Sequence, residues 1–140
     1  MEQAIQLKIR SLIQHPGHEP MIEYQKVDGT LFKKARSTYI RYDDRMSGEV
    51  IQTTLKVSER ELVIFRKGAV TMKLPLTIGL RRSATYSNHG MNMQLESEAE
   101  RLLVRREEDQ YSIDVTYHLY ANEDKLGTYE LALTYTEATK

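Results

Sequence analysis

Alternating apolar and polar side chains are the dominant pattern of this chain, and the pattern is clearest near the C-terminus. From Tyr111 to Leu119 every second residue is apolar or aromatic, and serine, aspartate, threonine and histidine stand between them. After the polar segment 122–125 the alternation resumes from Tyr129 to Tyr135. A period of two is typical of β-strands with one buried face. The region 111–135 is therefore predicted to form a long antiparallel hairpin.

The rest of the sequence repeats this alternation in short segments separated by turn residues. The first segment, Ile5 to Ile13, ends before Pro16-Gly17, because proline cannot donate to a sheet and glycine relaxes the backbone. Asp28-Gly29 is a dipeptide typical of tight hairpin turns. Further strands are predicted at 21–27, 30–34, 37–44, 50–57, 61–67, 70–78, 82–86, 91–95 and 101–107, with turns at 46–48, 58–60 and 87–90.

These segments predict an all-β fold, a single antiparallel up-and-down β-barrel of about eight to ten strands in one domain that spans residues 1–140. We favour a barrel over a sandwich, because short connections join most successive strands and closure leaves no exposed edge. Only residues 97–106 have a helix-favouring composition, and that segment is short for a helix among strands. Pro75 indicates an edge, a bulge or a strand end within 70–78.

The composition indicates a soluble domain without strong global electrostatics. Lysine plus arginine number 20 and aspartate plus glutamate number 20, and this formal net charge of zero disfavours binding to nucleic acid or an anionic membrane. The absence of cysteine excludes disulfides, thiolate metal sites and cysteine nucleophiles. The N-terminus lacks the basic and apolar regions of a signal peptide, and no segment has the length of a membrane-spanning helix. We therefore expect a cytoplasmic protein.

Few residues are spaced as catalytic or metal-binding groups usually are. His15 and His18 lie three positions apart beside nearby glutamates, but recognisable zinc sites supply more ligands at tighter spacing. No serine stands in a strand-to-helix nucleophile elbow. Asp43 and Asp44 point to opposite faces of a strand, which disfavours joint acid and base catalysis, and we interpret them as the start of a turn. We expect no enzyme, no catalytic residues, no metal and no cofactor.

Inward-facing tyrosine and arginine residues are the best candidates for a binding site. An inward tyrosine supplies apolar bulk and also a hydroxyl that needs a partner. Tyr117 and Tyr129 either fill the core or line a cavity, and filling is the favoured interpretation. Arg66 is in register with Ile64, but its strand is apolar on both faces, so its direction stays open. The candidate ligand-binding residues, at the polar end of an internal cavity, are Arg66, Tyr86, Tyr117 and Tyr129.

Several segments also have a recognisable order and spacing. They are Tyr39-Ile40-Arg41-Tyr42, Thr53-Thr54-Leu55-Lys56-Val57, Arg66 with Gly68-Ala69-Val70, Tyr117 to Asn122, and Leu126 to Tyr129. Together they resemble the YwiB family of small bacterial proteins, and the match runs from the first strand to Tyr135. This resemblance implies a calycin-like, lipocalin-like β-barrel in a bacterial cytoplasm. It implies no activity, because the family is a domain of unknown function.

The function stays undetermined at this point, and three hypotheses follow. The first is a non-enzymatic barrel that binds a small amphipathic or anionic ligand. The alternative is a protein-interaction module or a homodimer that uses an outer strand face carrying Val63 and Phe65. The third is an RNA-binding module, which needs exposed aromatic rings among the short basic clusters.

Overall fold

Ten antiparallel strands close into one barrel. The computed structural model describes residues 2–46, 49–58 and 60–137. Each strand pairs with its neighbours in the sequence, and β10 pairs with β1, so no sheet edge is left open. This order confirms the predicted all-β, up-and-down barrel. The strands are β1 (Glu2–Gln14), β2 (Met21–Lys34), β3 (Ser37–Met46), β4 (Glu49–Val57), β5 (Glu61–Gly68), β6 (Val70–Thr77), β7 (Arg82–Asn88), β8 (Met91–Glu107), β9 (Gln110–Ala121) and β10 (Asp124–Glu137).

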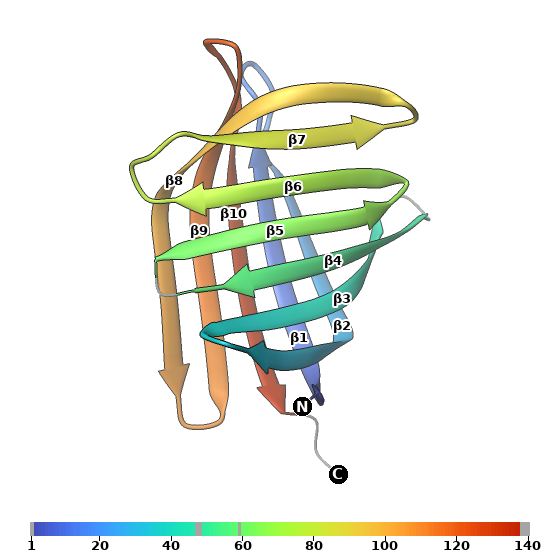
Figure 1. Ribbon diagram of the computed structural model, residues 1–140, viewed down its shortest axis with the longest axis vertical. Coiled ribbons are helices and arrows are strands. Elements are labelled where there is room, and N and C mark those ends of the chain that lie inside the picture. Colours follow the sequence, from blue (N-terminus) through green and yellow to red (C-terminus); the bar gives the residue numbers. More distant parts are fainter. Residues whose placement is uncertain (1, 47–48, 59, 138–140) are drawn as a thin grey trace.

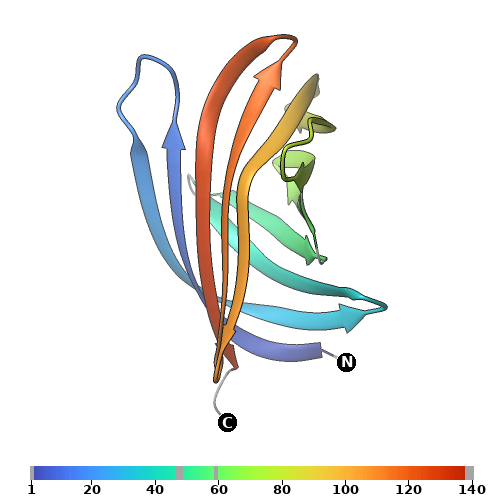
Figure 2. The same ribbon diagram turned by 90° about the vertical axis from the view of Figure 1, so that its left-hand side faces the viewer.

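The shape of the barrel follows from strongly curved strands. Figure 1 shows β3 to β7 crossing in front of β1, β8, β9 and β10 at a steep angle, and Figure 2 shows the long strands bending around the interior. The pairing of β8 with β9 shifts between Ala99 and Arg101, and the pairing of β9 with β10 shifts between Lys125 and Gly127. Such bulges bend a strand and increase its twist. The start of β1 and the end of β10 lie together at one end, called the termini end below.

The predicted C-terminal hairpin is confirmed as β9 and β10, and it closes the barrel against β1. Tyr117 is opposite Tyr129 across this hairpin, and Leu133 is opposite Ile9 of β1. The two strands are joined at Asn122, whose positive φ of 59° is a turn conformation that asparagine tolerates. The predicted turns at 46–48 and 58–60 fall partly on 47–48 and 59, which lie outside the described residues. No helix among the described residues is long and apolar enough to cross a membrane.

The prediction of a hairpin turn at Asp28-Gly29 is wrong, because Gly29 lies inside β2. Gly29 is opposite Ile5 of β1 on one side and Tyr42 of β3 on the other. A Cβ at this position would lie 2.7 Å from the Arg41 carbonyl oxygen and 2.7 Å from Leu7 Cδ1. The glycine therefore serves close packing inside the barrel wall rather than a turn.

The segments 91–95 and 101–107, predicted as separate strands, belong to one long strand, β8. The helix-favouring residues between them are extended, because Ser97 and Ala99 are fully buried against the interior. Hydrogen bonding supports this path, since Ser97 Oγ donates to the carbonyl oxygen of Pro75. The pairing of β6 with β7 stops at Lys73, two residues before Pro75. Pro75 lies inside β6 and is opposite Val63 of β5, so of the predicted edge, bulge or strand end it occupies an edge position, beyond the last residue of β6 that pairs with β7.

Apolar side chains fill the middle of the barrel and leave space at its two ends. The largest fully buried apolar residues include Ile5, Leu7, Ile40, Leu55, Ile64 and Leu76. They come from β1, β3, β4, β5 and β6 and meet Val115 of β9 and Leu133 of β10 in one cluster. Met91 and Met93 are exposed by 71% and 42% and take no part in it. Burial of this apolar surface is the main force that holds the barrel closed.

Candidate functional site

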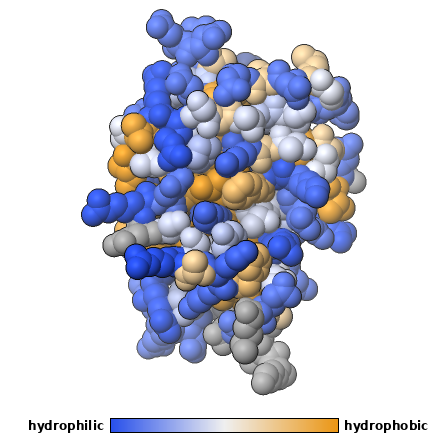
Figure 3. All heavy atoms as spheres, in the orientation of Figure 1, coloured by the Kyte–Doolittle hydropathy of each residue, from blue (hydrophilic) through white to orange (hydrophobic). Residues whose placement is uncertain are grey.

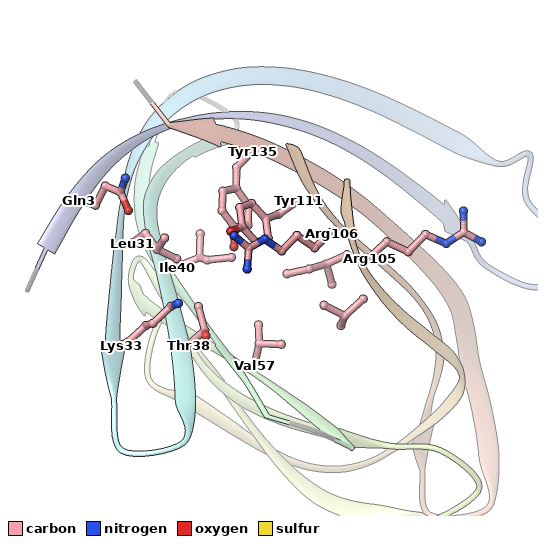
Figure 4. Close-up of a pocket in the computed structure, with 12 residues that line it drawn as sticks. Gln3, Leu31, Lys33, Thr38, Ile40, Val57, Arg105, Arg106, Tyr111 and Tyr135 are labelled. Carbon is pink, nitrogen blue, oxygen red and sulfur yellow. The ribbon is translucent and has the colours of Figure 1, made fainter. Parts of the chain in front are cut away.

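A cavity of about 270 Å³ lies inside the barrel at its termini end, and we call it the basic pocket. Its apolar wall is formed by Leu31, Ile40, Val57 and Ile113, from four different strands. Its polar lining residues are Gln3, Lys33, Thr38, Arg105, Arg106, Tyr111 and Tyr135. Figure 4 shows Lys33, Arg106 and Tyr135 directed toward this space. The pocket thus combines an apolar wall with cationic and hydroxyl groups.

Three residues of the basic pocket form a continuous row across the barrel wall. Arg106 of β8 is opposite Tyr111 of β9, and Tyr111 is opposite Tyr135 of β10. The two tyrosine rings are stacked with their centroids 4.9 Å apart. The Cζ atom of Arg106 lies 5.1 Å from the centroid of the Tyr111 ring. A cation–π contact of this kind positions the guanidinium without neutralising its charge.

Lys33 and Arg106, the two cations directed into the basic pocket, are exposed residues with no described counter-charge. Neither Lys33 nor Arg106 belongs to an ion pair among the described side chains. The described residues that line the pocket also include no carboxylate. Arg105 points away from the pocket in Figure 4, as its opposite phase on β8 requires. An anionic group that enters the pocket is therefore attracted by two positive charges.

Tyr135 supplies a neutral hydrogen-bond donor beside these cations. The pKa of Tyr135 is raised to about 12, chiefly by burial and also by the neighbouring Tyr111, while Arg106 lowers it. The hydroxyl therefore stays protonated near neutral pH. The sequence analysis did not identify this pocket, because Arg105-Arg106 is only one of several short basic clusters. The alternation of Leu102, Val104 and Arg106 is the signal that places Arg106, although exposed, on the side of β8 that lines the pocket.

A second cavity, of about 170 Å³, lies inside the barrel at the opposite end, and we call it the inner polar cavity. It brings together Arg66, Tyr117 and Tyr129, three of the residues predicted from the sequence. The predicted Tyr86 is not among its lining residues. Tyr86 packs against the hydrophobic core, and its hydroxyl accepts a hydrogen bond of 3.3 Å from Asn88 Nδ2. The structure therefore unites three of the four predicted residues and places Tyr86 apart.

Tyr117 and Tyr129 combine packing with lining of the inner polar cavity. Their ring centroids are 5.2 Å apart, and Tyr117 also packs against the hydrophobic core. The Tyr129 hydroxyl forms a hydrogen bond of 3.1 Å with His15 Nε2. His15 and His18 have perpendicular rings with centroids 6.4 Å apart. In the described part of the chain no group of three or more histidine, cysteine, aspartate or glutamate residues is placed to hold a metal ion.

Asp44 is the residue of the inner polar cavity that the sequence interpretation misplaced. It lies within β3 rather than at the start of a turn, and its side chain is only 3% exposed. Asp43 is exposed on the opposite face, as predicted. Asp44 Oδ1 and Arg66 Nε are both buried without a hydrogen-bond partner among the described residues. The alternation of Ile40, Tyr42 and Asp44 is the signal that places this carboxylate inside.

The tyrosines near Arg66 and Asp44 are held in their neutral form. Burial raises the pKa of Tyr117 to about 12, although Arg66 lowers it. Burial is also the largest cause that raises the pKa of Tyr42, with Arg66 opposing and Asp44 adding a smaller increase. Burial raises the pKa of Tyr129 as well. The cavity therefore offers hydroxyl donors beside the Arg66 guanidinium and the carboxylates of Asp44, Glu23 and Glu130.

The outer face of β5 exposes little of Val63, one of the two residues predicted for protein contacts. Val63 is only 7% exposed, and Lys73 Nζ lies 6.0 Å from the centroid of the Phe65 ring. Val63 and Phe65 have the opposite phase to the core residues Leu62 and Ile64, and binding of a partner at this outer face stays a prediction. Figure 3 shows mostly hydrophilic atoms on one face of the molecule, with apolar atoms in separate patches. Tyr24 of β2 is the most exposed of the large apolar or aromatic residues, at 74%.

Comparisons with known proteins agree with this barrel. A family model described as "Domain of unknown function (DUF1934)" matches residues 7–133. The uncharacterized beta-barrel protein YwiB of Bacillus subtilis (strain 168) is 24% identical over 138 residues, which are 99% of this chain and 96% of that protein. The crystal structure of ywiB protein from Bacillus subtilis matches with a TM-score of 0.85 and 22% identity, covering 99% of this chain and 94% of the other. The chain therefore belongs to the DUF1934 family, whose function is unknown.

Proposed function

We propose that the protein is a non-enzymatic barrel that binds a small amphipathic anion in its basic pocket. The observation that carries this proposal is the cavity of about 270 Å³ in which Lys33 and Arg106 face an apolar wall without a described counter-charge. Its volume is close to the lower end of the range for small-molecule pockets, about 300–1,000 Å³. Lipocalins hold ligands inside comparable up-and-down barrels, which supports the proposal by analogy of fold alone.

The chemistry of the basic pocket matches the two parts of such a ligand. A carboxylate or phosphate head can accept hydrogen bonds from Arg106 and from the neutral Tyr135 hydroxyl. An aliphatic tail can then contact Leu31, Ile40 and Val57. The predicted site around Arg66 fits an anion less well, because Asp44 and Glu23 line the same cavity. We therefore place the anion at the termini end.

Arg106→Gln is expected to weaken octanoate binding by about tenfold, because a charge-assisted hydrogen bond contributes about 1.5–3 kcal/mol. Isothermal titration calorimetry of the full chain with octanoate measures this effect. Octanol has a similar tail without the charge and is expected to bind more weakly than octanoate to the unaltered protein.

Arg105→Gln is the matched control for Arg106→Gln. Arg105 is the adjacent residue and also lines the basic pocket, but its guanidinium points away from it, so its replacement removes one positive charge without removing a group directed at the ligand. It is expected to leave octanoate affinity within about twofold. Equal affinity for octanol and octanoate, or an equal loss in both arginine variants, would contradict the proposed head-group contact.

A second candidate function, RNA binding, is favoured by one outer groove. Lys8, Arg10, Tyr24 and Lys26 line this groove, where Lys8 is opposite Lys26 and Arg10 is opposite Tyr24. Two like charges directly opposite each other destabilise a sheet, so a bound polyanion would relieve their repulsion. The exposed Tyr24 ring can also stack on a base.

Tyr24→Ala is expected to weaken binding of a labelled single-stranded oligouridine by about tenfold, the loss of one stacked base. Fluorescence anisotropy at increasing salt measures the affinity, which should fall as salt rises. Met21→Ala, at another exposed residue of β2, is the control for loss of exposed apolar surface. Undetectable or salt-independent binding would exclude this second function.

A further inference from the structure

The inner polar cavity contains opposite charges that do not pair with each other. Asp44 and Arg66 both line it, yet no ion pair among the described side chains joins them. Asp44 is 3% exposed, and its Oδ1 atom has no hydrogen-bond partner among the described residues. The Nε atom of Arg66 is buried and unpartnered in the same way. Buried charged groups without partners are strongly unfavourable, so this arrangement favours a molecule that satisfies both.

The two unpartnered groups define the chemistry of that molecule. A carboxylate such as Asp44 accepts hydrogen bonds, and it is best satisfied by an ammonium group. The guanidinium of Arg66 and the neutral Tyr117 hydroxyl donate, and they are best satisfied by a second carboxylate. Glu23 of β2 and Glu130 of β10 also line the cavity and add negative charge for the ammonium group. A ligand that complements these protein groups therefore carries both an ammonium group and a carboxylate.

The size and the apolar lining of the cavity restrict the rest of the molecule. About 170 Å³ corresponds to roughly six liquid water volumes of about 30 Å³ each, enough for about six to nine non-hydrogen atoms. The apolar lining residues are Ile13, Met72, Leu74, Leu119 and Leu131. A short aliphatic side chain can contact these residues while the two charged groups face Asp44 and Arg66.

We propose that the inner polar cavity is a second binding site and that it takes a small aliphatic α-amino acid in its zwitterionic form. Asp44 and Glu23 bind the ammonium group, and Arg66 with Tyr117 binds the carboxylate. This site is separate from the basic pocket, which takes a molecule of a single negative charge at the other end of the barrel. The proposal therefore does not depend on the proposed function.

The test compares L-valine with two analogues that each lack one charged group. Isobutylamine lacks the carboxylate and 3-methylbutanoate lacks the ammonium group, while both keep the branched aliphatic part. Titration of the isotope-labelled full chain, followed by amide chemical shifts in NMR, measures the affinity and locates the site. L-valine is expected to cause saturable shifts in β3, β5 and β9, and each analogue is expected to bind at least about tenfold more weakly.

Adjacent residues on the opposite face supply matched controls for the two charges. Asp44→Asn and Arg66→Gln are each expected to weaken L-valine binding about tenfold, because each removes a charge-assisted contact. Asp43→Asn and Lys67→Gln remove the same charges at exposed neighbouring positions and are expected to leave the affinity unchanged. Glu23→Gln, at a partly buried residue, provides a third variant if a change at Asp44 prevents folding.

Three results would overturn this inference. One is the absence of saturable shifts with L-valine in the folded, unaltered protein. Another is equal affinity for L-valine and isobutylamine, which would make the cavity a site for amines alone. The third is an equal effect of Asp44→Asn and Asp43→Asn. Titrations with octanoate alone report on the basic pocket, so failure of one site is distinguishable from failure of the other.

Discussion

Replacing Gly29 by alanine is expected to lower the free energy of unfolding by about 2–3 kcal/mol. The new Cβ would lie 2.7 Å from the Arg41 carbonyl oxygen and 2.7 Å from Leu7 Cδ1. The Leu7 side chain can move, but the Arg41 oxygen belongs to the backbone of β3, so relief of the contact requires the two strands to separate. Separation weakens their ladder and opens the packing around Tyr42, which is opposite Gly29.

Urea denaturation followed by circular dichroism measures this loss. Asp28→Ala is the control, because Asp28 is the exposed residue next to Gly29, and it is expected to change the unfolding free energy by less than about 0.5 kcal/mol. The urea concentration at the unfolding midpoint should fall in Gly29→Ala. The dependence of the unfolding free energy on urea concentration should change little, since the same surface is exposed on unfolding. An unchanged midpoint for Gly29→Ala would mean that the wall at this position has room for a side chain.

Raising the pH from 10 to 12 is expected to destabilise the barrel strongly through its buried tyrosines. Burial raises the pKa of both Tyr117 and Tyr135 from 10.0 to about 12. In this interval the unfolded chain loses these protons first, so the folded state holds more protons than the unfolded state. The contribution of these tyrosines to the unfolding free energy is then expected to be fully present below pH 10 and to be lost as the pH rises to about 12. Tyr42 and Tyr129 act in the same direction.

A shift of this size corresponds to about 2–3 kcal/mol for Tyr117. Urea denaturation at closely spaced alkaline pH values measures the fall, and tyrosinate absorbance follows ionisation in parallel. Tyr117→Phe is expected to remove its share of the fall, while Tyr24→Phe, at an exposed ring, is the control for loss of a hydroxyl. A pH dependence that is identical in Tyr117→Phe and the unaltered chain would contradict burial of the Tyr117 hydroxyl.

The local pattern was sufficient where each strand keeps one phase. The hairpin of β9 and β10 follows directly from its alternation, and Arg66 faces inward with Ile64 as their shared phase allows. The turn predicted at Asp28-Gly29 shows where local reasoning fails. An aspartate followed by glycine indicates a turn when only the four residues around it are considered. The glycine at position 29 is instead required by the close approach of Leu7 and Arg41, which come near it only in the closed barrel.

The residues of the two cavities were harder to predict, because bulges and register decide which side chains share an end. On β8 the inward residues are Leu95, Ser97 and Ala99 before the bulge and Leu102, Val104 and Arg106 after it. If the alternation of Leu95, Ser97 and Ala99 continued without the bulge, Arg106 would lie on the outer, solvent-facing side of β8. One extra residue reverses the faces of everything that follows it in a strand.

Alternation and short connections were enough to predict an all-β chain whose last hairpin closes a barrel. The period of two assigns each side chain to a face, because neighbouring Cβ atoms in a strand point in opposite directions. Only the tertiary structure decided that Arg106 joins Lys33 at one end while Asp44 joins Arg66 at the other. The physical reason is that register between strands is set by packing of the whole interior. The sequence of a single strand does not specify which residue of the neighbouring strand will lie opposite each of its own residues.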